Sequence, residues 1–286
     1  MPSLPEFGAP LVPAAFLGAG PWAEASWALF GAPLDATVTF RPGSRFGPGA
    51  IRAASPVLED WSPVLRRSLR DRPFCDLGDL EFIPGDTAQA LAAIESVVAE
   101  IARQSRRPLM LGGEHLVTLG AVRALARVTP DLMLLQFDAH ADLRVDYLGN
   151  RLSHATVMRR SGEVLGPSRL FQLGIRSGTA EEWAYAEAST HLHPGAVDLP
   201  EDWRGALRGH PVYVTVDIDS VDPAFAPGTG TPEPGGPSSA ALLAAIDGLV
   251  GLDIVGADVV EVAPAYDGGG QTAVLAAKVV RELLLL

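Results

Sequence analysis

The feature that most constrains the fold is an alternation of short, nearly continuous apolar runs with longer amphipathic runs. Apolar runs of this kind are typical of parallel strands that are covered on both faces. The predicted strands are Trp27–Gly31, Pro108–Leu111, Leu132–Phe137, Arg169–Gly174, Val212–Val216 and Ile254–Val262. The predicted helices are Thr87–Ser105, Leu116–Val128, Ser238–Val250 and Thr272–Leu284, with apolar residues three and four positions apart. The pattern predicts an α/β fold of three layers, with a mostly parallel sheet and helices on both faces.

The chain is expected to form one domain over residues 1–286. Its 286 residues, 48% of them hydrophobic, are enough for one large core. We find no internal repeat and no low-complexity linker that would divide it. Residues 1–25 are expected to be an N-terminal extension, packed on the surface of the domain or on a neighbouring subunit.

Charge and composition exclude several classes of function. The net charge is −12, and an acidic chain lacks the basic surface that nucleic-acid binding requires. The apolar runs are short and interrupted, so we expect no membrane span, and the N-terminus does not resemble a signal peptide. Cys75 is the single cysteine, so no disulfide can form within the chain. These features predict a cytoplasmic protein.

Charged residues and histidines follow four of the predicted strands at their carboxyl ends. In open α/β sheets ligands bind at these ends, so the polar residues of different strands are expected to meet in one crevice. The residues concerned are Glu114 and His115 after the first of these strands, Asp138, His140 and Asp142 after the second, Asp217, Asp219 and Asp222 after the third, and Glu261 at the end of the last.

This constellation predicts a metal centre. Alternate residues of an extended chain share one face, so Asp138, His140 and Asp142 can address one site, and Asp217 can do the same with Asp219. Buried carboxylates without opposing charges repel one another, and cations remove that cost. The four carboxylates are neutralised by two divalent ions. Ligands rich in carboxylate, with imidazole and without thiolate, suit Mn²⁺ better than structural zinc.

Each piece alone has a plainer interpretation. Asp-x-His-x-Asp is compatible with a solvated loop, Asp-rich segments are common in turns, and the Gly-Gly-Glu-His segment that ends at His115 can be a tight strand-to-helix turn. His154 alone is compatible with a surface histidine and Glu261 with a structural carboxylate. The order of the motifs, each after a buried strand, favours the metal site.

Together these motifs resemble the signatures of the arginase/agmatinase (ureohydrolase) family. The segments that carry the resemblance are GGEH (Gly112–His115), DAHADLR (Asp138–Arg144), SHATVMRR (Ser153–Arg160), DIDSVDPAFAPGTGTPEPGG (Asp217–Gly236) and VEVAPAYD (Val260–Asp267). The stretch Gly31–Arg52 is also similar to that family's N-terminal segment. The resemblance runs from about Gly31 to the C-terminus.

The resemblance implies an arginase-like fold and two manganese ions per chain, bridged by hydroxide. It places His115, Asp138, Asp142 and Asp217 on one ion, and Asp138, His140, Asp217 and Asp219 on the other. His154 corresponds to a histidine that passes a proton to the leaving amine, a role that Asp138 can share, and Glu261 corresponds to the glutamate that binds the guanidinium group. Such a centre hydrolyses a small cationic guanidino compound to urea and an amine.

The segment after Asp142 favours agmatine as the substrate, with putrescine as the second product, and so a role in polyamine biosynthesis. It lacks the pattern by which arginases hold an amino-acid head group and resembles agmatinases. Arg144 and Asn150 are candidate substrate-binding residues. Arg144 and Arg151 can also meet a carboxylate, so guanidinobutyrate, guanidinopropionate and arginine stay open as alternatives. Phe40 and Leu116 depart from the familiar family pattern, which leaves the pocket's shape open.

Two other classes remain as alternatives, a single-zinc deacetylase-like enzyme and a relative that has lost catalysis. The resemblance also implies a homo-oligomer, a trimer or hexamer. Asp222 is interpreted as a residue that supports a turn or the metal ligands. The segments around His191, His193 and His210 are expected to be surface loops.

Overall fold

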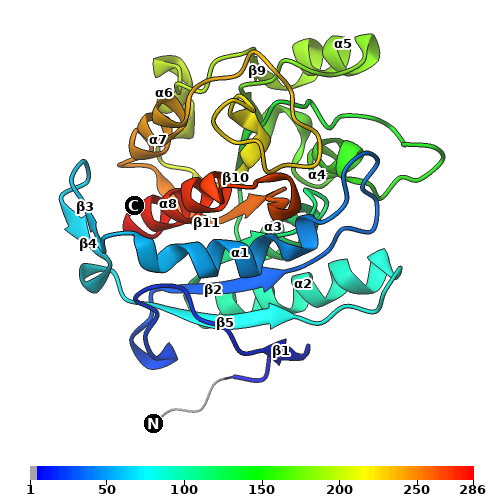
Figure 1. Ribbon diagram of the computed structural model, residues 1–286. Helices are drawn as coiled ribbons and strands as arrows, with labels where there is room; N and C mark the ends of the chain where they lie inside the picture. Colours follow the sequence, from blue (N-terminus) through cyan, green and yellow to red (C-terminus); the bar gives the residue numbers. More distant parts are fainter. Residues whose placement is uncertain (1–4) are drawn as a thin grey trace.

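The computed structural model describes residues 5–286, which form a nine-stranded sheet covered by helices (Figure 1). Neighbouring strands are parallel throughout except at the β1–β5 edge, where they are antiparallel. In spatial order the strands are β1 (Leu11–Val12), β5 (Phe74–Leu80), β2 (Trp27–Ala32), β6 (Arg107–Gly112), β11 (Asp253–Val260), β10 (Pro211–Asp217), β7 (Met133–Phe137), β8 (Leu170–Leu173) and β9 (His191–His193). A separate hairpin pairs β3 (Trp61–Ser62) with β4 (Arg67–Ser68).

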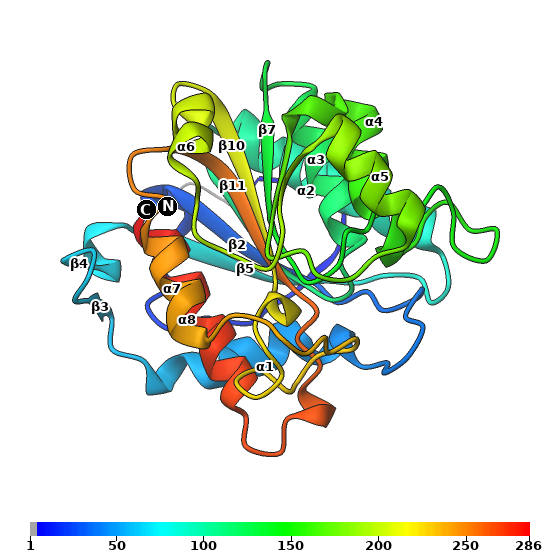
Figure 2. The same ribbon diagram turned by 90° about the horizontal axis from the view of Figure 1, so that it is seen from above.

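The helices form one layer on each face of the sheet (Figure 2). One layer contains α2 (Thr87–Arg103), α3 (Val117–Ala126), α4 (Val157–Leu165) and α5 (Ala180–Ser189). The other contains α1 (Gly47–Ala54), α6 (Glu201–Leu207), α7 (Ser239–Asp247) and α8 (Gln271–Leu285). Each layer buries its own apolar cluster against the sheet. The predicted three-layer α/β architecture is therefore confirmed.

The local sequence explains why α2 and α3 pack closely on the sheet. Asp86 caps α2 by accepting a hydrogen bond from the backbone N of Gln89 at 2.9 Å, as N-cap residues commonly do. In α3, a Cβ added to Gly120 would lie 2.8 Å from Cγ2 of Ile94 in α2. Glycine at this position lets the two helices approach, and this fixes the helix that follows the predicted metal-binding segment after β6.

The register of the four central strands aligns their carboxyl ends. Leu111 of β6 is opposite Val259 of β11, and Phe137 of β7 is opposite Val216 of β10. Val216 is in turn opposite Val259, so these four residues form one row across the sheet. The residues that follow this row leave the sheet at the same level. Parallel register thus brings distant motifs of the sequence to one edge.

The predicted strands and helices are all present, with ends that differ by a few residues. Strand β5 was not predicted because Asp76, Gly78 and Asp79 interrupt its apolar run. The structure explains these charges, since Arg52 of α1 donates to Asp76 Oδ2 at 2.8 Å and also pairs with Asp79. Helices α1, α4, α5 and α6 were also missing from the prediction.

The assignment of His191 and His193 to surface loops was wrong. Both lie in strand β9 and are half-buried. The ring of His191 stacks on Phe171, with the ring centres 4.1 Å apart, and Trp203 packs edge-on against both rings. These histidines belong to an aromatic cluster at the edge of the sheet.

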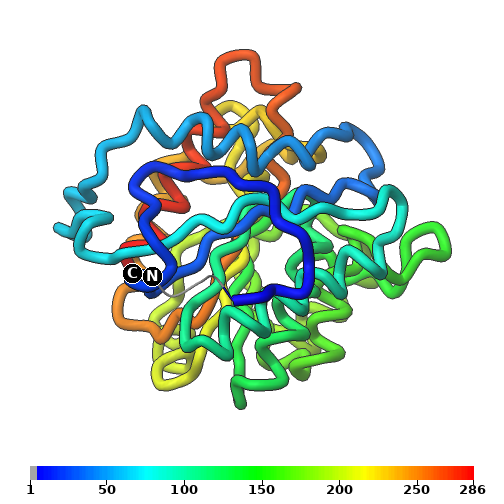
Figure 3. The backbone as a smooth tube through the Cα atoms, turned by 90° about the horizontal axis from the view of Figure 1, so that it is seen from below, coloured from blue at the N-terminus to red at the C-terminus, as the bar shows by residue number. Residues whose placement is uncertain are grey.

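The segment before β2 packs along the β5 side of this same chain (Figure 3). Strand β1 pairs with β5, and Phe7, Phe16 and Trp22 are buried. Residues 1–4 of the predicted extension lie outside the described part of the chain. Across residues 5–286, none of the helices combines the length and the apolar character needed to cross a membrane.

A buried acidic contact between α7 and α8 generates a stability prediction. Asp247 Oδ1 and Glu282 Oε2 are both buried without a hydrogen-bond partner among the described residues. Burial, together with the neighbouring Glu282, raises the pKa of Asp247 to about 6. Between pH 3.8 and about 6, Asp247 is therefore protonated in the native state and ionised in the unfolded state. Because the native state binds the extra proton, the free energy of unfolding falls as the pH rises through this window.

We expect Asp247→Asn to remove this fall, because an amide carries no charge and can donate to Glu282. At pH 7.5 the variant should gain about 1 kcal/mol in unfolding free energy, a value reduced for the partial exposure of the site. Urea unfolding at pH 5 and pH 7.5 measures it, with the exposed Asp253→Asn as a control. Equal or lower stability of Asp247→Asn at pH 7.5 would contradict the prediction.

Candidate metal centre

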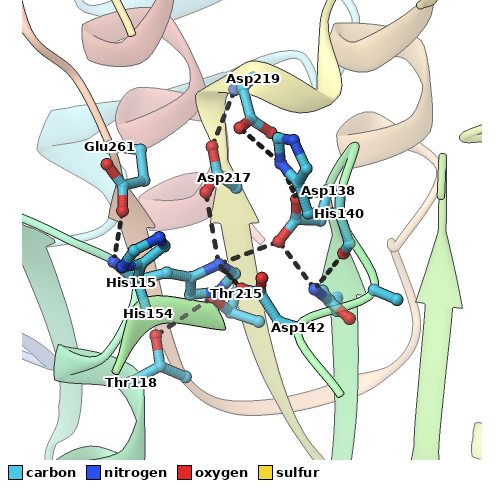
Figure 4. Close-up of polar contacts among 12 residues, drawn as sticks. His115, Thr118, Asp138, His140, Asp142, His154, Thr215, Asp217, Asp219 and Glu261 are labelled. Carbon is cyan, nitrogen blue, oxygen red and sulfur yellow. Dashed lines mark hydrogen bonds and ion pairs between the residues drawn. The ribbon is translucent and has the colours of Figure 1, made fainter. Parts of the chain in front are cut away.

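The first group of candidate ligands surrounds His115, just beyond the end of β6. Gly113 lies so close to Leu34 that an added Cβ would stand 1.9 Å from the Leu34 carbonyl oxygen, so the tight turn requires glycine. This turn directs the His115 ring to the sheet edge (Figure 4). Its Nδ1 lies 2.9 Å from Oδ2 of Asp138 and 3.3 Å from Oδ2 of both Asp142 and Asp217.

The second group surrounds His140 and shares Asp138 with the first. His140 Nδ1 lies 3.0 Å from Asp219 Oδ2 and 3.6 Å from Asp138 Oδ1. Asp138 therefore directs Oδ2 to the His115 group and Oδ1 to the His140 group. Asp217 Oδ1 accepts from the backbone N of Asp219 at 2.8 Å, which links the two groups on the other side. All six residues predicted as ligands lie together.

The electrostatics of this cluster favour a cation. Asp138, Asp142, Asp217 and Asp219 are all buried, and no arginine or lysine of the described chain forms an ion pair with them. Burial, with the charge of Asp138, raises the pKa of Asp142 to about 7. Burial alone would lower the pKa of His115, but the neighbouring carboxylates outweigh it and raise that pKa well above its usual range. Carboxylates so arranged attract positive charge.

The hydrogen bonds behind His115 leave Nδ1 available for a metal. Thr215 Oγ1 donates its one proton to Asp258 Oδ1 at 2.6 Å, so it accepts from His115 Nε2, 2.9 Å away. Nδ1 is buried and has no hydrogen-bond partner among the described residues, although it faces carboxylate oxygens. An unpartnered nitrogen among oxygens fits a divalent cation. The His and Asp cluster is therefore a divalent metal site.

Glu261 lies across the site from His140 and is held by the backbone. Its Oε1 accepts from the backbone N of His115 at 2.8 Å, and its own backbone N donates to Gly113 O at 2.8 Å. Glu261 has a φ of +64° and Asp142 a φ of +52°, a left-handed conformation that is uncommon for such residues and is concentrated at functional sites. Burial raises the pKa of Glu261 to about 8, and a bound cation would favour its charged form.

A cavity of about 260 Å³ opens onto both groups. Its buried end is lined by His115, Asp142, Asp217 and Glu261 together with the half-buried His140. The rest of the lining includes the buried Glu182 and several residues that are half-buried or exposed, namely Thr39, Arg144, Tyr147, His154 and Thr179. The cavity thus joins the metal site to a wall of mixed polarity.

Of the two further substrate-binding candidates, Arg144 reaches the cavity and Asn150 does not. Arg144 lines it, with Nε 3.6 Å from Glu182 Oε2 and the guanidinium carbon 5.0 Å from the centre of the Tyr147 ring. Asn150 is exposed and does not line the cavity; its side-chain oxygen accepts from the backbone N of Leu152. Asn150 shapes the adjoining turn.

Phe40 and Leu116, the departures from the family pattern, are not among the residues that line the cavity. Phe40 is exposed beside the Arg41 guanidinium, and Leu116 is fully buried. Asp222 supports a turn, since Oδ2 accepts from the backbone N of Gly235 at 2.7 Å. Arg176 was not assigned a role; it donates to the backbone oxygen of Asp219 at 2.9 Å and so fixes that ligand's loop.

His154 lines the cavity and is tied to two residues that sequence reasoning did not assign. Its Nδ1 lies 3.2 Å from Oγ1 of Thr37, and Thr37 contacts both oxygens of Glu114 at 2.7 Å. Burial, with the charge of His140, lowers the pKa of His154 to about 4. The ring is therefore neutral near pH 7 and can accept a proton.

Some of the missed residues carry a signal in the sequence. Thr215 and Asp258 are polar residues inside otherwise apolar strand runs, and a buried polar group of this kind needs a specific partner. Gln136 is a third case, and its Nε2 donates to Asp138 Oδ2 at 2.7 Å. Thr37 and Glu182 lie in segments without such a pattern, and only the fold brings them to the site.

Comparison with known proteins agrees with this geometry. The protein-family model described as “Arginase family” matches residues 25–286 of the sequence. An agmatinase of Bacillus subtilis (strain 168) is 46% identical over 268 residues, 92% of each chain. A guanidinobutyrase of Pseudomonas aeruginosa is 36% identical over 90% of this chain and 85% of its own. The structure of agmatine ureohydrolase of Thermoplasma volcanium superposes with a TM-score of 0.84 at 35% identity, covering 94% of this chain and 92% of that one. The protein is therefore a member of the arginase family.

Proposed function

We propose that this ureohydrolase converts agmatine and water to putrescine and urea at a centre of two manganese ions. The observation that carries the proposal is the pair of ligand groups that share Asp138 and open, with Glu261, onto one cavity. The relatives named agmatinase support the choice of substrate.

The six residues provide ligands for two ions. His115, Asp138, Asp142 and Asp217 would hold one, and Asp138, His140, Asp217 and Asp219 the other. Oxygen and imidazole donors of this kind suit Mn²⁺. When bound, two such ions supply a nucleophilic water near neutral pH and neutralise charge at the substrate.

Glu261 is positioned to bind the guanidinium group. Its Oε1 is anchored by the His115 backbone, so the carboxylate cannot rotate freely. A planar guanidinium forms paired hydrogen bonds with a carboxylate, and its positive charge stabilises the ionised form of Glu261. Binding would therefore fix the plane of the substrate relative to the metal ligands.

Hydrolysis replaces the bond between carbon and the amine nitrogen with a bond between carbon and oxygen. The leaving nitrogen takes the electron pair of the broken bond, and both protons of water end on it, which gives an ammonium group. A neutral His154 at the cavity wall can accept the first proton and pass it to this nitrogen. Asp138 is the other candidate for this transfer.

The outer wall of the cavity favours agmatine over a guanidino acid. Glu182 lies 3.6 Å from Arg144 and offsets its positive charge, while its oxygens accept backbone hydrogen bonds from Leu143 and Thr179. A substrate carboxylate would have to compete with Glu182 for Arg144. The Tyr147 ring can instead cover the aliphatic chain of agmatine.

The shared carboxylate also distinguishes the proposal from the other two classes. A single-zinc deacetylase would not require the second set of ligands around His140. A non-catalytic relative would not require both the His115 and the His140 ligand groups. We further propose a homo-oligomer, a trimer or hexamer, that acts in the cytoplasm in polyamine biosynthesis; family resemblance supports this assembly, and the single cysteine fits a reducing compartment.

Because Asp138 contacts both ligand groups, Asp138→Asn should lose both ions, and Asp219→Asn should lose chiefly the ion at His140. Elemental analysis after manganese loading and gel filtration should give about two ions per wild-type chain, about one for Asp219→Asn and fewer than one for Asp138→Asn. Urea release should fall at least about a thousandfold in Asp138→Asn. The exposed Asp202→Asn serves as the control. Full metal content or turnover in Asp138→Asn would refute the assignment.

The substrate assignment is tested by urea release from agmatine, arginine, 4-guanidinobutyrate and 3-guanidinopropionate, with a chelated sample as the blank. We expect kcat/KM for agmatine to exceed the others by at least about a hundredfold, because a misplaced carboxylate leaves charges unpaired. Preferred turnover of guanidinobutyrate would assign Arg144 to a substrate carboxylate and overturn the agmatine proposal. Absence of urea from all four would overturn the activity itself.

A further inference from the structure

Glu114 is a buried carboxylate that the metal centre does not use. Its side chain is 0% exposed, and both of its oxygens are directed to one residue. Oε2 accepts from the backbone N of Thr37 at 2.7 Å, and Oε1 accepts from the hydroxyl of Thr37, also at 2.7 Å. Glu114 thus fixes the direction in which the Thr37 hydroxyl points its single proton.

This direction determines what Thr37 can do for His154. Thr37 Oγ1 accepts from the backbone N of His154 at 3.0 Å and lies 3.2 Å from Nδ1 of its ring. Where Glu114 is ionised, the Thr37 hydroxyl donates its proton to Oε1, and Oγ1 offers only lone pairs to the ring. If Nδ1 carried no proton, its lone pair would face a lone pair of Thr37 Oγ1, and the two would repel. The contact is attractive only if Nδ1 carries the proton.

We propose that Glu114, acting through Thr37, holds His154 as the Nδ1–H tautomer and so leaves the lone pair of Nε2 to the cavity. Glu114 and Thr37 are positioning residues in this arrangement. The hydroxyl of Ser153 lies farther from the same Nδ1, at 3.4 Å, and can turn either to donate or to accept, so this longer contact does not select a tautomer. Among the described residues Nε2 has no hydrogen-bond partner, which leaves it free for a reacting group.

The arrangement serves proton transfer. A base that must take a proton from water and return it to an amine needs its lone pair on the side of the reactants. With the opposite tautomer, Nε2 would already carry a proton and could not accept the first one. This consequence rests on the proposed function, whereas the tautomer itself follows from the hydrogen bonds and can be measured without turnover.

A purely structural role for Glu114 makes a different prediction. If Glu114 only anchors the loop around Thr37, an isosteric amide that keeps the loop in place should leave His154 unchanged. In Glu114→Gln, the amide oxygen can still accept from the Thr37 backbone, and the amide nitrogen then donates to the Thr37 hydroxyl. That hydroxyl must turn and donate to Nδ1 of His154, which moves the ring proton to Nε2.

The direct test is the tautomer of His154 by NMR at a pH well above 7, because burial raises the pKa of Glu114 to about 7 and the proposal concerns the ionised carboxylate. The protein is labelled with ¹⁵N-histidine and loaded with zinc, a diamagnetic ion, and its six histidines are observed in long-range ¹H–¹⁵N spectra. Loss of signals in His154→Gln assigns the ring. We expect a protonated Nδ1 in the wild type and a protonated Nε2 in Glu114→Gln. A protonated Nε2 in the wild type, or no change in the variant, would overturn the proposal.

Kinetics with manganese provide the second readout. Glu114→Gln and Thr37→Val should lower kcat about tenfold to a hundredfold with KM and metal content nearly unchanged, as for other residues that orient a catalytic group. Thr37→Ser, which keeps the hydroxyl, should restore kcat. A matched control is Asp267→Asn, a buried carboxylate that accepts from the Thr272 backbone away from His154.

The outcomes separate the two proposals. Loss of metal in Glu114→Gln would assign Glu114 to the metal centre and overturn its proposed action on His154 through Thr37, which we call the relay. Wild-type kcat in Thr37→Val would also overturn the relay. If none of the guanidines is hydrolysed but the NMR shows the expected tautomers, the relay stands and the proposed activity fails. If agmatine is hydrolysed and the tautomers do not change, the activity stands and the relay fails.

Discussion

Mutual repulsion of four buried carboxylates is the interaction on which the rest of this structure depends. Asp138, Asp142, Asp217 and Asp219 meet at one edge of the sheet, and no arginine or lysine of the described chain pairs with them. The register of the central strands brings them there, since the apolar row that ends at Phe137 and Val216 fixes the level at which the chains leave the sheet. The core therefore supplies the free energy that concentrates this charge, and cations lower its cost.

The strain of this arrangement is distributed over the backbone. Asp142 and Glu261 both adopt left-handed conformations, and each is held by hydrogen bonds from another segment. The Asp142 carbonyl accepts from Met158 and Arg159 at the start of α4, and Glu261 is bonded to the turn before His115. Conformations that cost about 1–3 kcal/mol each persist because several elements determine them at once. Hydrogen bonds from other elements thus fix the backbone at Asp142 and Glu261.

The layers and the candidate ligands could be predicted from the sequence because both have local signatures. Buried parallel strands appear in the sequence as apolar runs, and Asp138, His140 and Asp142 follow such a run directly. Strand β5 escaped prediction because Asp76 and Asp79 are compensated by Arg52, which is more than twenty residues away. Thr37 and Glu182 escaped for the same reason. Their roles come from contacts with residues that are distant in sequence, and no periodic pattern marks such contacts.

His115 and His154 share one structural arrangement, in which a carboxylate acts on the ring through a threonine hydroxyl. Asp258 acts through Thr215 on His115, and Glu114 through Thr37 on His154. A carboxylate in direct contact would stabilise the imidazolium form and raise the pKa of the ring. At His154 the intervening hydroxyl fixes which nitrogen carries the proton without placing a negative charge beside the ring, whereas His115 also faces the carboxylates of three metal-ligand candidates directly. His154 can thus keep a pKa lowered to about 4 by burial and still be oriented by a buried acid. For a group that must release its proton as readily as it accepts it, orientation without charge stabilisation is the more useful arrangement.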